Sequence, residues 1–166
     1  MRQRHRDKAL VRSFLLKRDV GSVLAWAESA SNDVGTLTSL LFDSDELLRW
    51  RTIEAFGQLA AHKASTNLED AREIIRRMLW GMNDESGTLM WNGCEVIAEV
   101  LVKVPALIPE YALNLTSFLE MSPFERGAHW AILRVSAYAT EPFKGSTDSL
   151  IRSLAHEDPH IRAFAA

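Results

Sequence analysis

The chain has 166 residues, of which 47% are hydrophobic and 25% are charged. This balance is typical of a globular domain that buries its core without metals or disulfides. Cys94 is the single cysteine, which excludes an intramolecular disulfide and makes a reducing compartment the default. Because no apolar run approaches the roughly 20 residues of a membrane span and the N-terminus is too polar for a signal peptide, we expect a cytoplasmic protein with no membrane span.

Charge is unevenly distributed along the chain. Residues 1–20 contain seven Lys or Arg and two Asp or Glu, so the net charge of −3 divides into +5 there and −8 over residues 21–166. The acidic body should not attract nucleic acid nonspecifically, and no nucleic-acid partner is expected.

The first predicted element is a basic amphipathic helix near the N-terminus. Leu10, Val11, Phe14 and Leu15 recur at helical spacing behind a basic face. Such a helix could bind an anionic membrane or RNA. We favour the alternative, in which residues 1–31 form capping helices that cover the first exposed core face and keep their charges in water.

Apolar residues follow a 3.6-residue period along almost the whole sequence, and strand alternation is absent. One stripe consists of Ala71, Ile74, Ile75, Met78 and Leu79, and another of Ile108, Tyr111, Ala112, Leu115, Phe118 and Leu119. Polar breaks at residues 43–46, 83–87, 121–123 and 157–159 each supply an N-capping residue or a proline to start the next helix. The pattern predicts an all-α array of short antiparallel helices.

The predicted helices recur as pairs. The segment WRTIEAFGQL from Trp50 aligns with WNGCEVIAEV from Trp91, and Glu54 then matches Glu95 at an offset of 41 residues. Two helices per roughly 40-residue unit are the signature of HEAT or armadillo repeats, which bury their apolar faces only by stacking. We therefore predict one domain over residues 1–166, a HEAT/armadillo-like right-handed α-solenoid of antiparallel helix pairs. Its repeats are expected at about 32–62, 69–104, 106–140 and 147–166, the last one incomplete.

Two segments, LLFDSDELLRWRTIEAFGQLA and SLAHEDPHIRAFAA, resemble the HEAT-like repeats first named for phycobilisome lyases, in which an apolar helix, an Asp/Pro turn and a second helix rich in Arg and Ala recur. The middle of the chain, LWGMNDESGTLMWNGCEVIAEVLVKVPALIPEY followed by RGAHWAILRV, is similar to a group of bacterial and archaeal HEAT-repeat proteins. The resemblance covers most of the chain from about residue 32 onward and implies a HEAT-repeat fold. The lyases attach or isomerise bilins, but no cysteine or histidine cluster here carries that activity across, and no cofactor is expected.

The stretch HEDPH, residues 156–160, fits the letters of the H-E-x-x-H zinc-protease motif. That motif needs both histidines on one face of a continuous helix, and Pro159 would disrupt a helix interior at a cost of roughly 3 kcal/mol or more. We interpret the stretch as an interhelical turn, with Asp158 as N-cap and Pro159 at the first helical position. Asp158 would then occupy the same turn position as Asp43 and Asp84, and no metal site is expected.

The densest group of candidate functional side chains lies in WGMNDESGTLMWNGCE, residues 80–95. Carboxylates clustered beside tryptophans could bind a cation or a basic peptide. Alternatively, Asp84 or Ser86 caps a helix, and Trp80 and Trp91 fill the core between repeats. A ligand surface is expected first here and on the neighbouring second helices. The candidate partner-binding residues are Trp50, Glu54, Asp84, Glu85, Trp91, Glu95 and Glu99.

No catalytic residues are predicted. Cys94 has no histidine nearby in the sequence that would activate its thiol, and His62 and His129 are isolated. The sequence lacks the glycine-rich motifs that bind nucleotide phosphates.

Two functions therefore remain open. The first is a noncatalytic scaffold that binds a protein or peptide partner. The second is a cofactor-handling or enzymatic HEAT-like protein, similar to a bilin lyase or to a base-excision glycosylase built on HEAT-type helices, although the acidic body argues against DNA. The incomplete last repeat would leave an uncapped apolar face, which favours a homo-oligomer formed through the exposed end of the solenoid.

Overall fold

The computed structural model describes residues 2–83 and 89–166, so the predicted caps Asp84 and Ser86 and the candidate site residue Glu85 lie outside the described residues. The described residues form helices, turns and bends, and contain no strand. The prediction of an all-α fold is confirmed. In chain order the helices are α1 (Arg2–Leu16), α2 (Val20–Ser29), α3 (Asp33–Leu40), α4 (Glu46–Ala64), α5 (Leu68–Met82), α6 (Gly93–Lys103), η1 (Pro105–Leu107), α7 (Ile108–Tyr111), η2 (Ala112–Phe118), α8 (Glu125–Ser136), η3 (Glu141–Ser146), α9 (Thr147–Ser153) and α10 (Pro159–Ala165).

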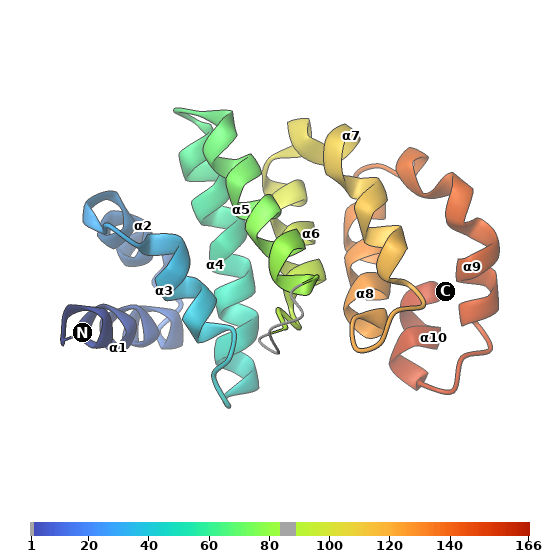
Figure 1. Ribbon diagram of the computed structural model, residues 1–166, viewed down its shortest axis with the longest axis horizontal. Helices are drawn as coiled ribbons and strands as arrows, with labels where there is room; N and C mark the ends of the chain where they lie inside the picture. The colour runs from blue at the N-terminus through green and yellow to red at the C-terminus, as the bar shows by residue number, and fades with distance from the viewer. Residues whose placement is uncertain (1, 84–88) are drawn as a thin grey trace.

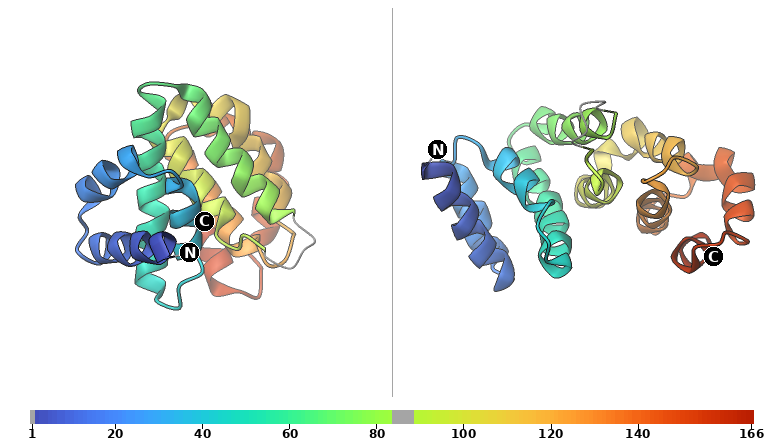
Figure 2. Two further views of the ribbon diagram at one scale, coloured as in Figure 1. Left: turned by 60° about the vertical axis from the view of Figure 1, so that its left-hand side comes forward. Right: turned by 60° about the horizontal axis from the view of Figure 1, so that its bottom comes forward.

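The helices stack side by side into a two-layered arch (Figure 1). α4, α6, α8 and α10 contact one another in series and form the inner layer, while α5, α7 with η2, and α9 lie on the outer side (Figure 2). The two termini lie at opposite ends of the arch. Within residues 2–83 and 89–166, none of the helices has the length and hydropathy that a bilayer span requires.

At the N-terminal end, α1 packs against α2, α3 and α4. Val11 and Leu15 are buried in the core. The basic side chains stay near the surface, where Lys8 donates to the carbonyl oxygen of Ser39 at 3.0 Å. α1 therefore covers an apolar face of its neighbours and keeps its charges in water.

Both predicted apolar stripes face the core, but they do so in different helix types. In α5, Ala71, Ile74, Ile75 and Met78 are buried on one face of a regular α-helix. The second stripe was expected on one α-helix and is divided instead: Ile108 and Tyr111 lie on α7, and Ala112, Leu115 and Phe118 lie on the 3-10 helix η2. Three residues per turn place positions 112, 115 and 118 directly above one another on one face of η2.

The HEDPH stretch forms the predicted turn. Asp158 is the N-cap of α10, its carboxylate accepts a hydrogen bond from the N–H of His160 at 2.8 Å, and Pro159 is the first residue of the helix. Arg162 donates to the carbonyl oxygens of His156 and Glu157 at 2.7 and 2.9 Å. The two histidines therefore lie on either side of the helix start, and not on one helical face.

The turn before α4 repeats these contacts with a shift from the predicted register. Asp45 is the N-cap of α4, and Arg49 donates to the carbonyl oxygen of Asp43 at 2.8 Å. The counterpart of Asp158 is therefore Asp45, and the predicted match with Asp43 is wrong. Asp43 corresponds to His156, since each accepts a hydrogen bond at 3.0 Å from the N–H of the capping aspartate.

Loss of either capping carboxylate should weaken the array. Asp45→Ala and Asp158→Ala are each expected to lower the free energy of unfolding by about 1 kcal/mol, because a helix N-terminal N–H loses its acceptor. Urea unfolding followed by circular dichroism measures the loss. Glu157 is exposed in the same turn, so Glu157→Ala is the control and should change stability by less than about 0.5 kcal/mol. Equal losses in all three variants would contradict the capping role.

Candidate functional site

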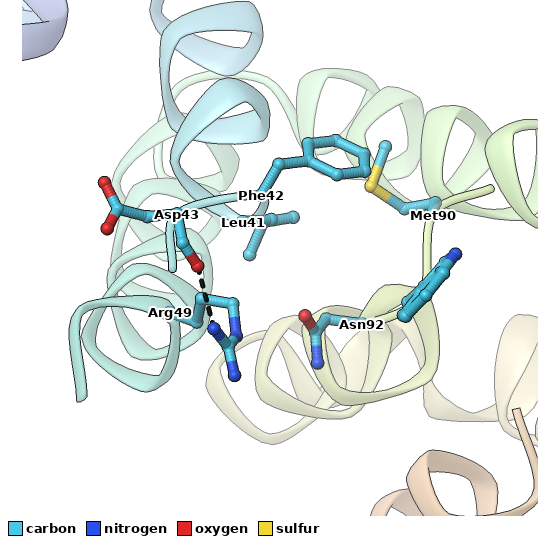
Figure 3. Close-up of a pocket in the computed structure, with 7 residues that line it drawn as sticks. Leu41, Phe42, Asp43, Arg49, Met90 and Asn92 are labelled. Carbon is cyan, nitrogen blue, oxygen red and sulfur yellow. Dashed lines mark hydrogen bonds between the residues drawn. The ribbon is translucent and has the colours of Figure 1, made fainter. Parts of the chain in front are cut away.

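A cleft of about 370 Å³ lies between the α3–α4 turn and the segment that precedes α6 (Figure 3). Phe42 and Met90 approach each other on one side of the cleft, and Arg49 and Asn92 lie on the opposite side. Four apolar and three polar residues line it: Leu41, Phe42, Met90, Trp91, Asp43, Arg49 and Asn92.

Backbone contacts fix the wall that carries Met90 and Trp91. The N–H of Met90 donates to the carbonyl oxygen of Gly81 at 3.0 Å, which ties this segment to the end of α5. A Cβ atom at residue 81 would lie 3.1 Å from the Cβ of Met90, so the glycine leaves room for the methionine. Met90 is buried, and the next side chain, Trp91, is 65% exposed. The wall therefore presents an indole ring to solvent from an anchored backbone.

The polar groups of the α3–α4 turn are held in place by local bonds. The carboxylate of Asp43 accepts from the N–H of Asp45 at 3.0 Å and from Nε of Arg12 at 3.4 Å. The backbone N–H of Asp45, followed by the Arg12 guanidinium, holds the pKa of Asp43 below its ordinary value. Asp43 is therefore ionised at neutral pH, and its carboxylate links α1 to the turn before α4.

Two predicted binding residues, Glu95 and Glu99, are buried on α6 where it packs against α8. Oε1 of Glu99 accepts from Nε of Arg134 at 2.7 Å, so a cation compensates its charge. Oε1 of Glu95 accepts from Nδ2 of Asn92 at 3.4 Å, and its Oε2 has no hydrogen-bond partner among the described residues. Burial raises the pKa of Glu95 to about 7 from an ordinary value of 4.5. Much of the Glu95 population therefore keeps its proton at neutral pH.

Gly127 of α8 allows this carboxyl to fit between the two helices. A Cβ atom at residue 127 would lie 2.7 Å from Oε2 of Glu95, which is closer than non-bonded atoms normally approach. α8 packs this closely against α6 only because residue 127 has no side chain.

Trp50 of α4 and Trp130 of α8 meet across α6. Their ring centroids are 5.0 Å apart and their planes are tilted by 55°, an arrangement that aromatic pairs favour. Gly127 of α8 lies beside Glu95 of α6, and Trp130 follows Gly127 by one helical turn. The Trp50–Trp130 pair therefore lies over the part of α6 that begins at Glu95. All residues of α6 from 93 to 102 are buried, and this part of the inner layer has no solvent-facing helix surface.

The structure divides the predicted site residues between two places. Trp91 lines the cleft, whereas Trp50 is half-buried on the inner layer. Glu54 is exposed one turn after Trp50 on α4, and Glu95 and Glu99 are buried on α6. The inner layer thus brings Trp50 near the buried carboxyls, and Trp91 lies apart from them at the cleft.

The two aligned tryptophans occupy different positions relative to their helices. Trp50 lies inside α4, whereas Trp91 lies two residues before α6 begins. α4 has 19 residues and α6 has 11, so the helix boundaries do not repeat at the offset of 41 residues. The alternative expectation that Trp80 and Trp91 fill the core is wrong, since they are 78% and 65% exposed.

Sequence reasoning identified one cleft residue, Trp91, and missed the others. Phe42 carried a usable signal, because it is a large apolar residue directly before the polar break at residues 43–46. Met90 and Asn92 carried none, since their place in the cleft depends on packing between segments far apart in the sequence.

No protein-family model matches the chain, and no curated protein sequence matches it. Solved structures that are similar in fold include two crystal structures of engineered proteins, Northeast Structural Genomics Consortium targets OR329 and OR497. Each superposes with a TM-score of 0.53 at 16% sequence identity. The matches cover 80% of this chain and 59% of OR329, and 96% of this chain and 46% of OR497. The chain thus spans about half the length of these engineered proteins, and the likeness concerns the helical fold alone.

Proposed function

We propose that the protein is a noncatalytic helical-repeat scaffold of the HEAT type, and that it binds an extended segment of a partner protein in the cleft beside Trp91. The observation that best supports this proposal is the exposure of two large apolar side chains at the cleft, 50% for Phe42 and 65% for Trp91. Exposed apolar side chains around a concave site are typical of binding surfaces.

The cleft suits a large apolar side chain of the partner. Burying a side chain of the size of Leu or Phe there would contribute about 1.5–3 kcal/mol. On the side opposite Phe42, Arg49 bonds the Asp43 carbonyl and Asn92 bonds Glu95. The remaining N–H groups of these two side chains would donate to the carbonyl oxygens of an extended backbone. The net charge of −8 over residues 21–166 favours a segment with Lys or Arg beside its apolar residue.

Selection from a displayed random-peptide library tests the proposal. The wild-type protein should enrich peptides that share one large apolar residue flanked by Lys or Arg. For a synthetic peptide of that consensus, Trp91→Ala should weaken binding by roughly tenfold or more, because truncating an exposed aromatic anchor commonly costs above about 1.4 kcal/mol.

Trp80 offers a matched control. It is an exposed tryptophan on the outer helix α5 and does not line the cleft. Trp80→Ala should therefore keep the wild-type affinity for the same peptide. No enrichment by the wild type, or equal losses in the two tryptophan variants, would overturn the proposal.

The cofactor-handling and enzymatic alternatives stay predictions. A bilin-lyase-like protein would bind a chromophore, and a glycosylase-like protein would bind DNA. Visible absorption by the purified protein, or DNA binding that weakens steeply with salt, would support one of these alternatives in place of the scaffold.

The C-terminal end of the arch is a second proposed contact surface, for another copy of the same chain. Within the described residues, α9 buries none of its side chains, and Ile151 and Leu154 are exposed. A sedimentation coefficient that rises with concentration in the wild type but not in Ile151→Asp would support association through this end.

A further inference from the structure

The joint between α6 and α8 contains one buried carboxyl with a charged partner and one without. Glu99 is bonded to Arg134 at 2.7 Å. Glu95, one turn earlier on α6, accepts from its own backbone N–H and, at 3.4 Å, from Nδ2 of Asn92, and the described residues provide no partner for its Oε2. Ionisation of Glu95 would place an uncompensated charge between closely packed helices, which is strongly unfavourable.

Charged groups on the surrounding elements do not compensate Glu95. On α8, Arg126 is bonded to Asp158 and His129 to the Glu125 carbonyl and the Ser153 hydroxyl. On α4, the basic side chains bond other groups: Arg49 the Asp43 carbonyl, Arg51 the Leu16 carbonyl and Lys63 the Asp33 carboxylate.

The remaining elements around α6 supply no partner either. The arginines of α5 pair with glutamates on the outer surface, one of them Glu110 of α7, and η1 and η2 contain no titratable side chain. On α6 itself, burial raises the pKa of Cys94 well above its ordinary value, so this thiol stays neutral.

We propose that the α6–α8 joint is a pH-sensitive hinge, in which loss of the Glu95 proton opens the inner side of the joint and separates Trp50 from Trp130. Opening admits water to the carboxylate, which removes the cost of leaving it buried and unpaired. The raised pKa of Glu95, about 7, places this transition within the physiological range.

The contacts around Glu95 explain why the inner side is the side that opens. Oε2 of Glu95 is closed off from solvent beside Gly127, so the carboxyl is not hydrated in the closed form. α6 is held on the outer side by α5 and laterally by α4. Across the inner side, the Trp50–Trp130 pair and the Glu99–Arg134 bond are side-chain contacts that can part without unfolding a helix.

Opening would change the angle between successive helix pairs. α4, α6 and α8 form consecutive parts of the inner layer (Figure 2), so a wider α6–α8 joint flattens the arch. The hinge therefore controls the curvature that the inner layer presents to a partner. The hinge shares Asn92 with the proposed peptide cleft, because this residue lines the cleft and donates to Glu95, but opening of the joint does not require a bound peptide.

Circular dichroism near 225 nm tests the hinge directly. Two indole rings in contact and tilted by 55° couple their electronic transitions, and the coupling gives a pair of bands of opposite sign that falls steeply with distance. The wild type should show these bands at about pH 6 and lose roughly half of their amplitude or more by about pH 8, as the ionised fraction of Glu95 rises.

Two variants assign the signal and its cause. Trp130→Phe should lack the paired bands at both pH values, which assigns them to the Trp50–Trp130 contact. Glu95→Gln, which cannot ionise, should keep them at both, and Glu95→Leu should do the same if the glutamine variant folds poorly. Three results would overturn the proposal. The wild type could keep paired bands of constant amplitude between about pH 6 and about pH 8, it could lack them at about pH 6, or a folded Glu95 variant could lose them.

Discussion

Replacing Glu95 by glutamine is expected to stabilise the protein at about pH 8 by up to about 3 kcal/mol. In the folded protein burial raises the pKa of Glu95 to about 7, against 4.5 for an exposed glutamate. Below about pH 4.5 the Glu95 carboxyl is protonated in both the folded and the unfolded protein, and its neutral form does not reduce the stability of the fold. As the pH rises toward 7, the unfolded chain ionises first, and stability is lost until the folded form ionises too.

The difference in unfolding free energy between the wild type and Glu95→Gln measures this effect. It should be small at about pH 4, grow up to about pH 7 and then stay constant. Ion pairs elsewhere in the molecule contribute equally to the unfolding free energies of the wild type and of Glu95→Gln, so their contribution cancels in the difference. Glu99→Gln is the matched control, because Glu99 already has Arg134 as a partner at 2.7 Å, and its loss should lower stability at about pH 8. A difference for Glu95→Gln that does not vary with pH would contradict the prediction.

Gly127→Ala is expected to lower the free energy of unfolding by about 2 kcal/mol, although alanine favours helices. The added Cβ would lie 2.7 Å from Oε2 of Glu95, and the carboxyl is enclosed between two helices with little freedom to move. α8 must shift away from α6, or Glu95 must leave its preferred conformation. Thermal unfolding monitored by circular dichroism measures the cost.

A second substitution separates this clash from other effects of the methyl group. In a Glu95→Ala background the contacting atoms are absent, so Gly127→Ala should become neutral or stabilise by up to about 1 kcal/mol. Gly145 has open space around it, and Gly145→Ala should change stability by less than about 0.5 kcal/mol. An unchanged cost of Gly127→Ala in the Glu95→Ala background would show that another contact is responsible.

The helical nature of the fold was predictable because apolar spacing directly reflects burial. Ile74, Ile75 and Met78 recur on one helical face, and all three are buried. The type of helix at η2 was not predictable, although its buried positions Ala112 and Leu115 are three residues apart. That spacing also fits one turn of an α-helix, so periodicity alone could not distinguish the two helix types.

The candidate site was less predictable, because it depends on contacts between distant segments. Trp91 attracted attention by its residue type, and it does line the cleft, but its partners come from the α3–α4 turn. Glu95 was predicted to lie on a binding surface, since carboxylates clustered beside tryptophans can bind a cation or a basic peptide. Its burial depends on Gly127, which belongs to the next helix pair and has no local signal of its contact.

The complete burial of α6 has a consequence for how the arch comes apart. From Val96 to Val102 the backbone amides lie in the hydrogen-bonded part of α6 and are enclosed by neighbouring helices, so hydrogen exchange there requires α4, α5 and α8 to separate. Within the described chain α9 buries no side chain, and its amides can exchange through local opening. Deuterium should therefore enter the C-terminal end first, while the slowest amides of α6 report the stability of the whole array.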